Sequence, residues 1–200
     1  MRKTNDKDRR RKRRRRRIQV IIIYTAIAVG LAWFFESQAT TTIIFVRHAE
    51  KAAMPADDPA LSAAGERRVA ELMRQLVDAD VVAGIDAVYA TPVRRSQETA
   101  RPIADALDIP VNTYDAADTE GVLETILDNH KGKIILVVGH SNTLPQLMYD
   151  LGASKKVPPI HDDEYDNLYL VSIPWFGKTK TIRLRFGEPY IPAAASDQPD

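Results

Sequence analysis

The sequence predicts an α/β domain in which helices cover both faces of a mostly parallel central sheet, preceded by an N-terminal hydrophobic helix. Three observations support this fold class. Short runs of aliphatic and β-branched residues alternate along the chain with longer amphipathic segments, the pattern of a sheet covered by helices. Residues 134–138 are five consecutive aliphatics, as in a strand buried on both faces. A separate uncharged segment, 18–35, precedes all of these elements.

The strands are predicted from short apolar runs bounded by charged or turn residues. The last two runs are joined near Gly177, and we expect them to form a hairpin. The predicted strands are 43–46, 86–90, 111–114, 134–138, 168–173 and 179–186.

The helices are predicted from apolar residues that recur at helical spacing between the strands. Ser62 can cap the first helix, Pro102 is expected to kink the second, and Gly152 stops the last. The predicted helices are 62–79, 93–107, 119–129 and 143–151. The end of the chain, 189–200, is rich in Pro, Ala and Asp, so we expect a flexible tail there.

The N-terminal segment has the composition of an export or anchoring signal. Residues 1–17 hold 12 of the 28 Lys and Arg residues, and 18–35 follow without a charge. That length is at the lower limit for a helix that crosses a bilayer. Basic residues stay on the cytoplasmic side, so we expect a domain over 40–188 on the extracytoplasmic, periplasmic side. A transmembrane anchor and a signal peptide cut after Ala39, which would leave the domain secreted to the periplasm, both fit the pattern.

The remaining charges argue against a nucleic-acid partner. Outside residues 1–17 there are 16 basic and 25 acidic residues, a balance of −9, so the surface of the domain repels nucleic acid. The basic tract is joined directly to an apolar helix, which favours attraction to a membrane surface. The chain has no cysteine, and this excludes disulfides, thiolate metal sites and cysteine nucleophiles.

Cationic and imidazole side chains follow three of the predicted strands. Arg47 and His48 end the first, Arg95 lies just after the second, and His140 follows the strand 134–138. Ligands of open α/β sheets bind beyond the carboxyl ends of the strands. We therefore expect these side chains to meet at one edge of the sheet, although each alone could be a surface or core residue.

These residue types suit phosphoryl chemistry. Two guanidinium groups, from Arg47 and Arg95, can clamp one phosphoryl group, and backbone N–H groups near Asn142 can add donors. A neutral imidazole such as that of His48 can attack phosphorus, while His140 stabilises charge on the transferred group. The histidines have no helix-borne zinc spacing, so we expect no metal. They are His48, His130, His140 and His161.

Four motifs in order resemble those of the histidine phosphatase superfamily, also called phosphoglycerate mutase-like. They are Phe-Val-Arg-His-Ala-Glu-Lys at 45–51, Leu-Ser-Ala-Ala-Gly at 61–65, Thr-Pro-Val-Arg-Arg-Ser-Gln-Glu-Thr-Ala at 91–100 and Val-Gly-His-Ser-Asn at 138–142. The resemblance covers roughly 43–186. It implies a phosphorylated nucleophile at His48, a phosphate pocket of Arg47, Arg95 (not Arg94) and His140, and no metal or organic cofactor.

The residue that protonates the leaving group is less constrained by the resemblance. Family members that supply it between the second arginine and the second histidine point here to Asp115, Asp118 or Glu120. We expect Asp118 first and Glu120 second, and Glu50 is a further candidate.

The predicted function is hydrolysis of phosphomonoesters outside the cytoplasm through a phosphohistidine at His48. The substrate is expected to be a small phosphorylated molecule, for instance a sugar phosphate of the cell envelope. The alternatives are a phosphohistidine-protein phosphatase and a phosphoglycerate mutase-like phosphotransferase. A non-enzymatic alternative is an idle phosphate-binding domain at the membrane.

Overall fold

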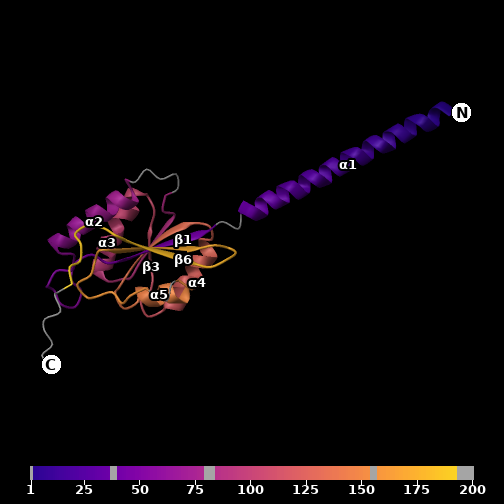
Figure 1. Cartoon of the computed structure of the whole chain (residues 1–200). Coiled ribbons are helices and arrows are strands. Elements are labelled where there is room, and N and C mark those ends of the chain that lie inside the picture. Colours follow the sequence, from indigo (N-terminus) through magenta and orange to yellow (C-terminus); the bar gives the residue numbers. More distant parts are fainter. Residues whose placement is uncertain (1, 37–39, 79–83, 154–156, 193–200) are drawn as a thin grey trace, which may run out of the picture. The chain divides into compact units, whose positions relative to one another are not determined.

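The computed structural model describes residues 2–36, 40–78, 84–153 and 157–192 of the chain. It divides into two units, Met1–Ala39 and Thr40–Asp200. The first consists of one helix, α1 (Arg2–Glu36), and the second is the α/β domain (Figure 1). The proposed cut after Ala39, the end of the predicted helix at Ala79 and much of the predicted tail lie outside the described residues.

Helix α1 joins the basic tract and the apolar segment without a break. Residues Arg10–Phe34 are long and apolar enough to cross a membrane. Their large apolar side chains, among them Ile21 and Trp33, are exposed. This N-terminal apolar helix was predicted, and its composition suits both a membrane anchor and a signal sequence.

Within the described residues of the second unit, six strands form one sheet in the order β3-β2-β4-β1-β5-β6. Three neighbouring pairs are parallel: β1 with β4, β2 with β4, and β2 with β3. Strand β5 runs antiparallel to β1, and β6 returns along β5 as the predicted hairpin. The sheet is therefore mixed, with a parallel part and an antiparallel edge. The strands are β1 (Thr41–Arg47), β2 (Ala87–Ala90), β3 (Val111–Thr113), β4 (Ile134–Gly139), β5 (Asn167–Ile173) and β6 (Lys180–Arg185).

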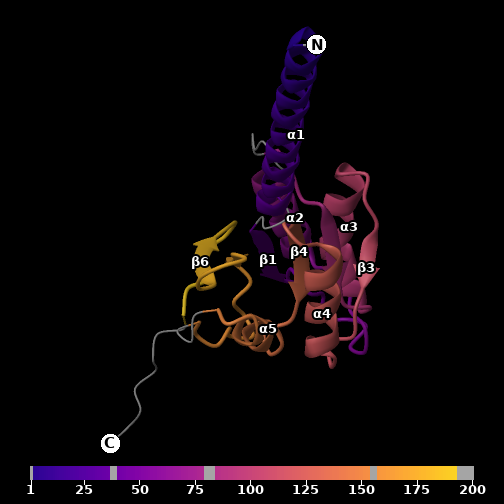
Figure 2. The same ribbon diagram turned by 90° about the vertical axis from the view of Figure 1, so that its right-hand side faces the viewer.

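Helices cover both faces of this sheet, as predicted, because alternate residues of the central strands point to opposite sides. Ile43 and Phe45 of β1 pack with α4 and α5, whereas Ile44 and Val46 pack with α2 and α3. Figure 2 shows α4 apart from the pair α2 and α3. The helices are α2 (Ala63–Leu76), α3 (Arg94–Ala106), α4 (Thr119–Asn129) and α5 (Leu144–Asp150).

Two of the local signals found in the sequence, at Ser62 and Gly152, act as expected in the helices, and the kink at Pro102 stays a prediction. The Ser62 hydroxyl caps α2 by accepting a hydrogen bond from the Gly65 N–H. Pro102 lies inside α3, and Gly152 follows α5 with a positive φ of 70°. These caps and stops determine where each helix ends, and thereby where the connecting segments leave the sheet.

Candidate active site

The predicted site residues leave the sheet from adjacent parallel strands. Arg47, the last residue of β1, lies opposite Gly139 of β4. The His48 N–H donates to the Gly139 carbonyl at 3.0 Å, so His48 and His140 start from the same point of the sheet. Strand β2 pairs with the other side of β4 and leads through Thr91 into α3, which carries Arg95. The parallel order thus gathers the three motifs at the carboxyl ends of the strands, where open α/β sheets bind their ligands.

His48 is held as a neutral imidazole in which one ring nitrogen, Nε2, carries no proton. Its side chain is only 3% exposed. Nδ1 lies 2.8 Å from the Ala49 carbonyl, which can only accept, so Nδ1 carries the proton. Nε2 accepts a hydrogen bond of 3.1 Å from Arg95 Nε. Burial lowers the pKa of His48 from 6.5 to about 3; the hydrogen bond to Ala49 opposes this shift, and the positive charges of Arg47 and Arg95 add to it.

The second histidine lies against the first. The ring centroids of His48 and His140 are 5.2 Å apart, in an edge-to-face arrangement. His140 Nε2 is 3.0 Å from Thr91 Oγ1, and that hydroxyl donates to Ser96 Oγ at 2.8 Å. Burial lowers the pKa of His140 to about 4, with further contributions from Arg95 and Arg47. Both imidazoles are therefore neutral at neutral pH.

Arg47 is bound by a segment more than a hundred residues away in the sequence. Its Nη1 donates to the carbonyls of His161 at 2.8 Å and Glu164 at 3.2 Å. The guanidinium carbon lies 4.1 Å from the centroid of the Tyr165 ring, a cation–π contact. The Nε atom of Arg47 is buried and makes no hydrogen bond to the described residues. The sequence predicts no helix or strand between 151 and 168, and no local pattern there indicated this contact.

Polar residues of the third motif hold the loop that carries His48. The Ala49 N–H donates to Thr99 Oγ1 at 3.0 Å, and this hydroxyl donates to the Arg95 carbonyl at 2.8 Å. Glu98 accepts from the Leu61 N–H at 2.7 Å and forms an ion pair with Arg94 at 2.6 Å. Arg94 therefore stays on the helix surface while Arg95 reaches His48, the division that the family resemblance implied.

Two of the candidate acids, Asp118 and Glu50, have partners away from the site histidines. Asp118 caps α4 by accepting from the Gly121 N–H at 2.9 Å. Glu120 lies exposed in the first turn of that helix, and Asn142 is exposed before α5. Asp118 and Glu50 make no hydrogen bond or ion pair to either site histidine among the described residues. The structure thus brings together Arg47, His48, Arg95 and His140. It places none of the predicted proton donors in contact with the two histidines among the described residues.

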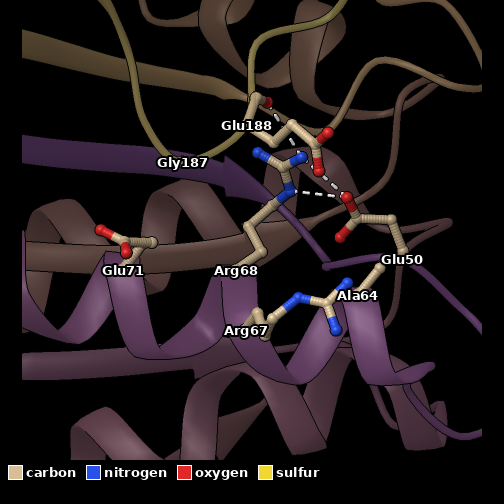
Figure 3. Close-up of a pocket in the computed structure, with 7 residues that line it drawn as sticks. All are labelled: Glu50, Ala64, Arg67, Arg68, Glu71, Gly187 and Glu188. Carbon is tan, nitrogen blue, oxygen red and sulfur yellow. Dashed lines mark hydrogen bonds and ion pairs between the residues drawn. The ribbon is translucent and has the colours of Figure 1, made fainter.

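Glu50 belongs to a neighbouring cavity of about 380 Å³. Figure 3 shows Arg68 of α2 reaching across this cavity to Glu50 and to the segment that contains Glu188. Arg68 Nε donates to Glu50 at 2.8 Å, and its two terminal nitrogens donate to the carbonyls of Phe186 and Glu188 at 2.9 and 3.1 Å. None of the four central site residues lines this cavity, so we assign it a structural role beside the site.

A metal centre has no donor set in the part of the chain that the structure describes, because no group of three or more His, Asp or Glu side chains is placed to hold an ion there. The site residues themselves form a cationic pocket of two arginines around two neutral imidazoles. Such a pocket suits an anion that brings its own negative charge.

The lowered pKa values predict a pH-dependent stability. Unfolded imidazoles bind a proton near pH 6.5, whereas the folded ones do so at about 3 and 4. Between these values the unfolded state binds more protons, so the contribution is complete above pH 6.5 and is lost as the pH falls. Urea unfolding of the full chain in detergent should show a free energy of unfolding roughly 2–4 kcal/mol lower at pH 5 than at pH 7. His48→Asn should reduce this difference by about half; an unchanged difference would contradict the assignment.

Comparisons with known proteins agree with the arrangement. Residues 43–118 match the model of the histidine phosphatase superfamily (branch 1), whereas no curated protein sequence matches the chain. The fold is similar to that of the protein histidine phosphatase SixA complexed with tungstate, with a TM-score of 0.58 and 18% identity over 72% of this chain and 96% of that chain.

Two further solved structures share the fold. A mycobacterial glucosyl-3-phosphoglycerate phosphatase, in complex with inorganic phosphate, gives a TM-score of 0.54 and 12% identity over 74% of this chain and 97% of that chain. Phosphoglycerate mutase from Plasmodium falciparum gives 0.51 and 16% identity over 80% and 99%. The match of 43–118 and its motifs assigns this part of the chain to the histidine phosphatase superfamily (branch 1), a family of enzymes of the phosphatase and mutase kind, and the domain has the fold of its solved structural neighbours.

Proposed function

We propose that the protein hydrolyses small phosphomonoesters through a phosphohistidine at His48. The observation that carries this proposal is the state of His48 Nε2, which has a lone pair and lies beside Arg95 at 3.1 Å. A bound phosphoryl group would replace the imidazole as the partner of Arg95. The nucleophile and the group that neutralises the phosphate are thus already adjacent before substrate binds.

The roles of the other residues follow from their chemistry. Arg47 and Arg95 bind the phosphoryl oxygens. The one N–H of the neutral His140, on Nε2, points to Thr91 Oγ1 in this structure and would turn to donate to a phosphoryl oxygen once substrate is bound. The hydrogen bond from His48 Nδ1–H to the Ala49 carbonyl fixes the tautomer and the orientation of the His48 ring. Attack by Nε2 gives a phosphohistidine, which water then hydrolyses to inorganic phosphate.

Two structural neighbours support narrower forms of this proposal. The likeness to SixA supports phosphohistidine-protein phosphatase activity as a second candidate. The likeness to the mycobacterial enzyme supports a sugar phosphate as substrate.

We place the domain on the extracytoplasmic side of a membrane, with α1 as its anchor. Support comes from the basic residues before Ile18 and the exposed apolar surface of 18–34. Membrane fractionation and N-terminal sequencing of the mature protein test this topology. A mature protein that begins at Thr40 would replace the anchor by a cleaved signal peptide.

The direct test of the proposed activity is release of inorganic phosphate by the full chain in detergent. We expect hydrolysis of an aryl phosphate and of sugar phosphates without added metal and in the presence of a chelator. Transfer of the phosphoryl group to a second position of the same substrate, without phosphate release, would favour the mutase instead. A phosphohistidine-containing protein as the one substrate hydrolysed would favour the second candidate.

A further inference from the structure

The turn at residues 161–164 is fixed next to the site. The His161 carbonyl accepts from the Glu164 N–H at 3.0 Å, and the Glu164 carboxylate accepts from the His161 N–H at 3.2 Å. Arg47 donates to the backbone carbonyls of His161 and Glu164, the first and last residues of this turn. Glu164 also forms an ion pair of 2.9 Å with Arg185 of β6. The turn is therefore held by the phosphate-binding arginine on one side and by the sheet on the other.

The two residues in the middle of this turn are Asp162 and Asp163, and their carboxylates have different partners. Asp162 Oδ1 accepts from Ser141 Oγ at 3.4 Å. Ser141 directly follows His140, so this carboxylate lies next to the segment that carries the second site histidine. The negative charge of Asp162 also raises the pKa of Arg47 more than the charge of Asp163 does. Asp163 interacts with Tyr190 instead.

Four other carboxylates considered for this role form ion pairs or cap a helix. Glu50 is paired with Arg68, and Glu164 and Asp166 are buried and paired with Arg185. Asp118 caps α4. Asp162 is exposed and accepts one long hydrogen bond from a neutral hydroxyl. No ion pair among the described residues holds this carboxylate in place, so it is the one most available to a bound substrate.

We propose that Asp162 is the catalytic acid and base of the reaction, an inference that rests on the proposed function. Nε2 of His48 forms a bond to phosphorus while the bond between phosphorus and the leaving oxygen breaks. The electron pair of that bond remains on the oxygen, which takes the proton of the Asp162 carboxyl group.

The second step returns the proton. The oxygen of a water molecule attacks phosphorus, and the electrons of the N–P bond return to Nε2 of His48. The proton of the water passes to the Asp162 carboxylate, and inorganic phosphate leaves. Asp162 is protonated and His48 is neutral at the end, so the cycle is complete without another co-reactant.

Substrates that differ in their need for a proton test this role. Nitrophenolate leaves without protonation, whereas the alkoxide of a sugar phosphate does not. With the full chain in detergent, Asp162→Asn should lower kcat/KM for glucose 6-phosphate by about 10²- to 10³-fold and for 4-nitrophenyl phosphate by less than about 5-fold. Asp163→Asn should leave both values unchanged. Ser141→Ala should shift the ratio of the two values in the same direction as Asp162→Asn, by a smaller factor.

The outcomes separate this inference from the proposed function. Equal losses for both substrates in Asp162→Asn, or no loss for either, would overturn the role of Asp162 while the hydrolase stands. The same selective loss in Asp118→Asn and not in Asp162→Asn would assign the acid to Asp118. Full activity of His48→Ala would overturn the proposed function itself. Thermal unfolding of each variant identifies any loss of structure, and in that event the Ser141→Ala ratio decides.

Discussion

Replacing His48 by alanine is expected to lower kcat/KM for a phosphomonoester by roughly 10⁴-fold or more, as loss of a covalent nucleophile does in other enzymes. The second site histidine cannot take over the role. His140 lies 5.2 Å from His48 between ring centroids, and its Nε2 is engaged with Thr91. The arginines would still bind phosphate, so binding of inorganic phosphate to the variant should persist.

The matched control for this variant is His130→Asn. His130 follows the last turn of α4, and its side chain forms a hydrogen bond of 2.9 Å with the hydroxyl of Tyr89 in β2. It makes no hydrogen bond to the four central site residues among the described residues. We expect its kcat/KM to stay within about 3-fold of the parent value, as for a substitution outside the catalytic residues. A steady-state assay with an aryl phosphate measures both variants. Residual activity of His48→Ala at a tenth of the parent value would exclude His48 as the nucleophile.

Replacing Arg68 by alanine is expected to have the largest effect on stability, about 3 kcal/mol. The Arg68 side chain is 8% exposed and that of Glu50 is 21% exposed. Removing the guanidinium leaves the Glu50 carboxylate without its counter-ion and the carbonyls of Phe186 and Glu188 without their donor. The segment after β6 would then be detached from α2.

Arg67→Ala is the control for Arg68→Ala, because Arg67 lines the same cavity (Figure 3) and is exposed. We expect that variant to lie within about 0.5 kcal/mol of the parent in urea unfolding. Equal losses of stability in the two variants would show that the cavity, and not the three hydrogen bonds of Arg68, determines the effect.

The strands and helices were predictable because local patterns define them. The aliphatic run after Lys133 gave β4, and the apolar spacing after Ser62 gave α2. The order of the strands was not predictable, since it depends on pairings between distant segments. Strand β1 lies between β4 and the antiparallel β5. It also begins two residues before the predicted run, because Thr41 and Thr42 pair with β5.

The centre of the site was predictable for a related reason. Arg47, His48, Arg95 and His140 each follow directly after, or one turn beyond, a strand of the parallel part of the sheet. Their meeting therefore needs only the rule for strand ends. The contacts of Arg47 with His161, Glu164 and Tyr165 depend on how a long loop folds back, which no local pattern describes.

The residue that protonates the leaving group could not be predicted from the sequence. Asp118 has the sequence position that the family resemblance implies, yet in the structure its carboxylate accepts from Gly121. An Asp three residues before a backbone N–H at the start of a helix is equally a capping residue, and the sequence does not separate the two roles. Asp162 lies in the loop that the sequence left without a described shape, and its proximity to Ser141 follows from tertiary structure.

The most direct test of the account is to trap the phosphorylated enzyme. The full chain is mixed with a labelled aryl phosphate and quenched within milliseconds in base, where phosphohistidine survives and serine phosphate esters are lost. Peptide mapping then locates the label. The account predicts one phosphoryl group on Nε2 of His48, absent from His48→Ala and present in Asp162→Asn. Label on another residue, or release of phosphate with inversion at phosphorus and no labelled peptide, would contradict it.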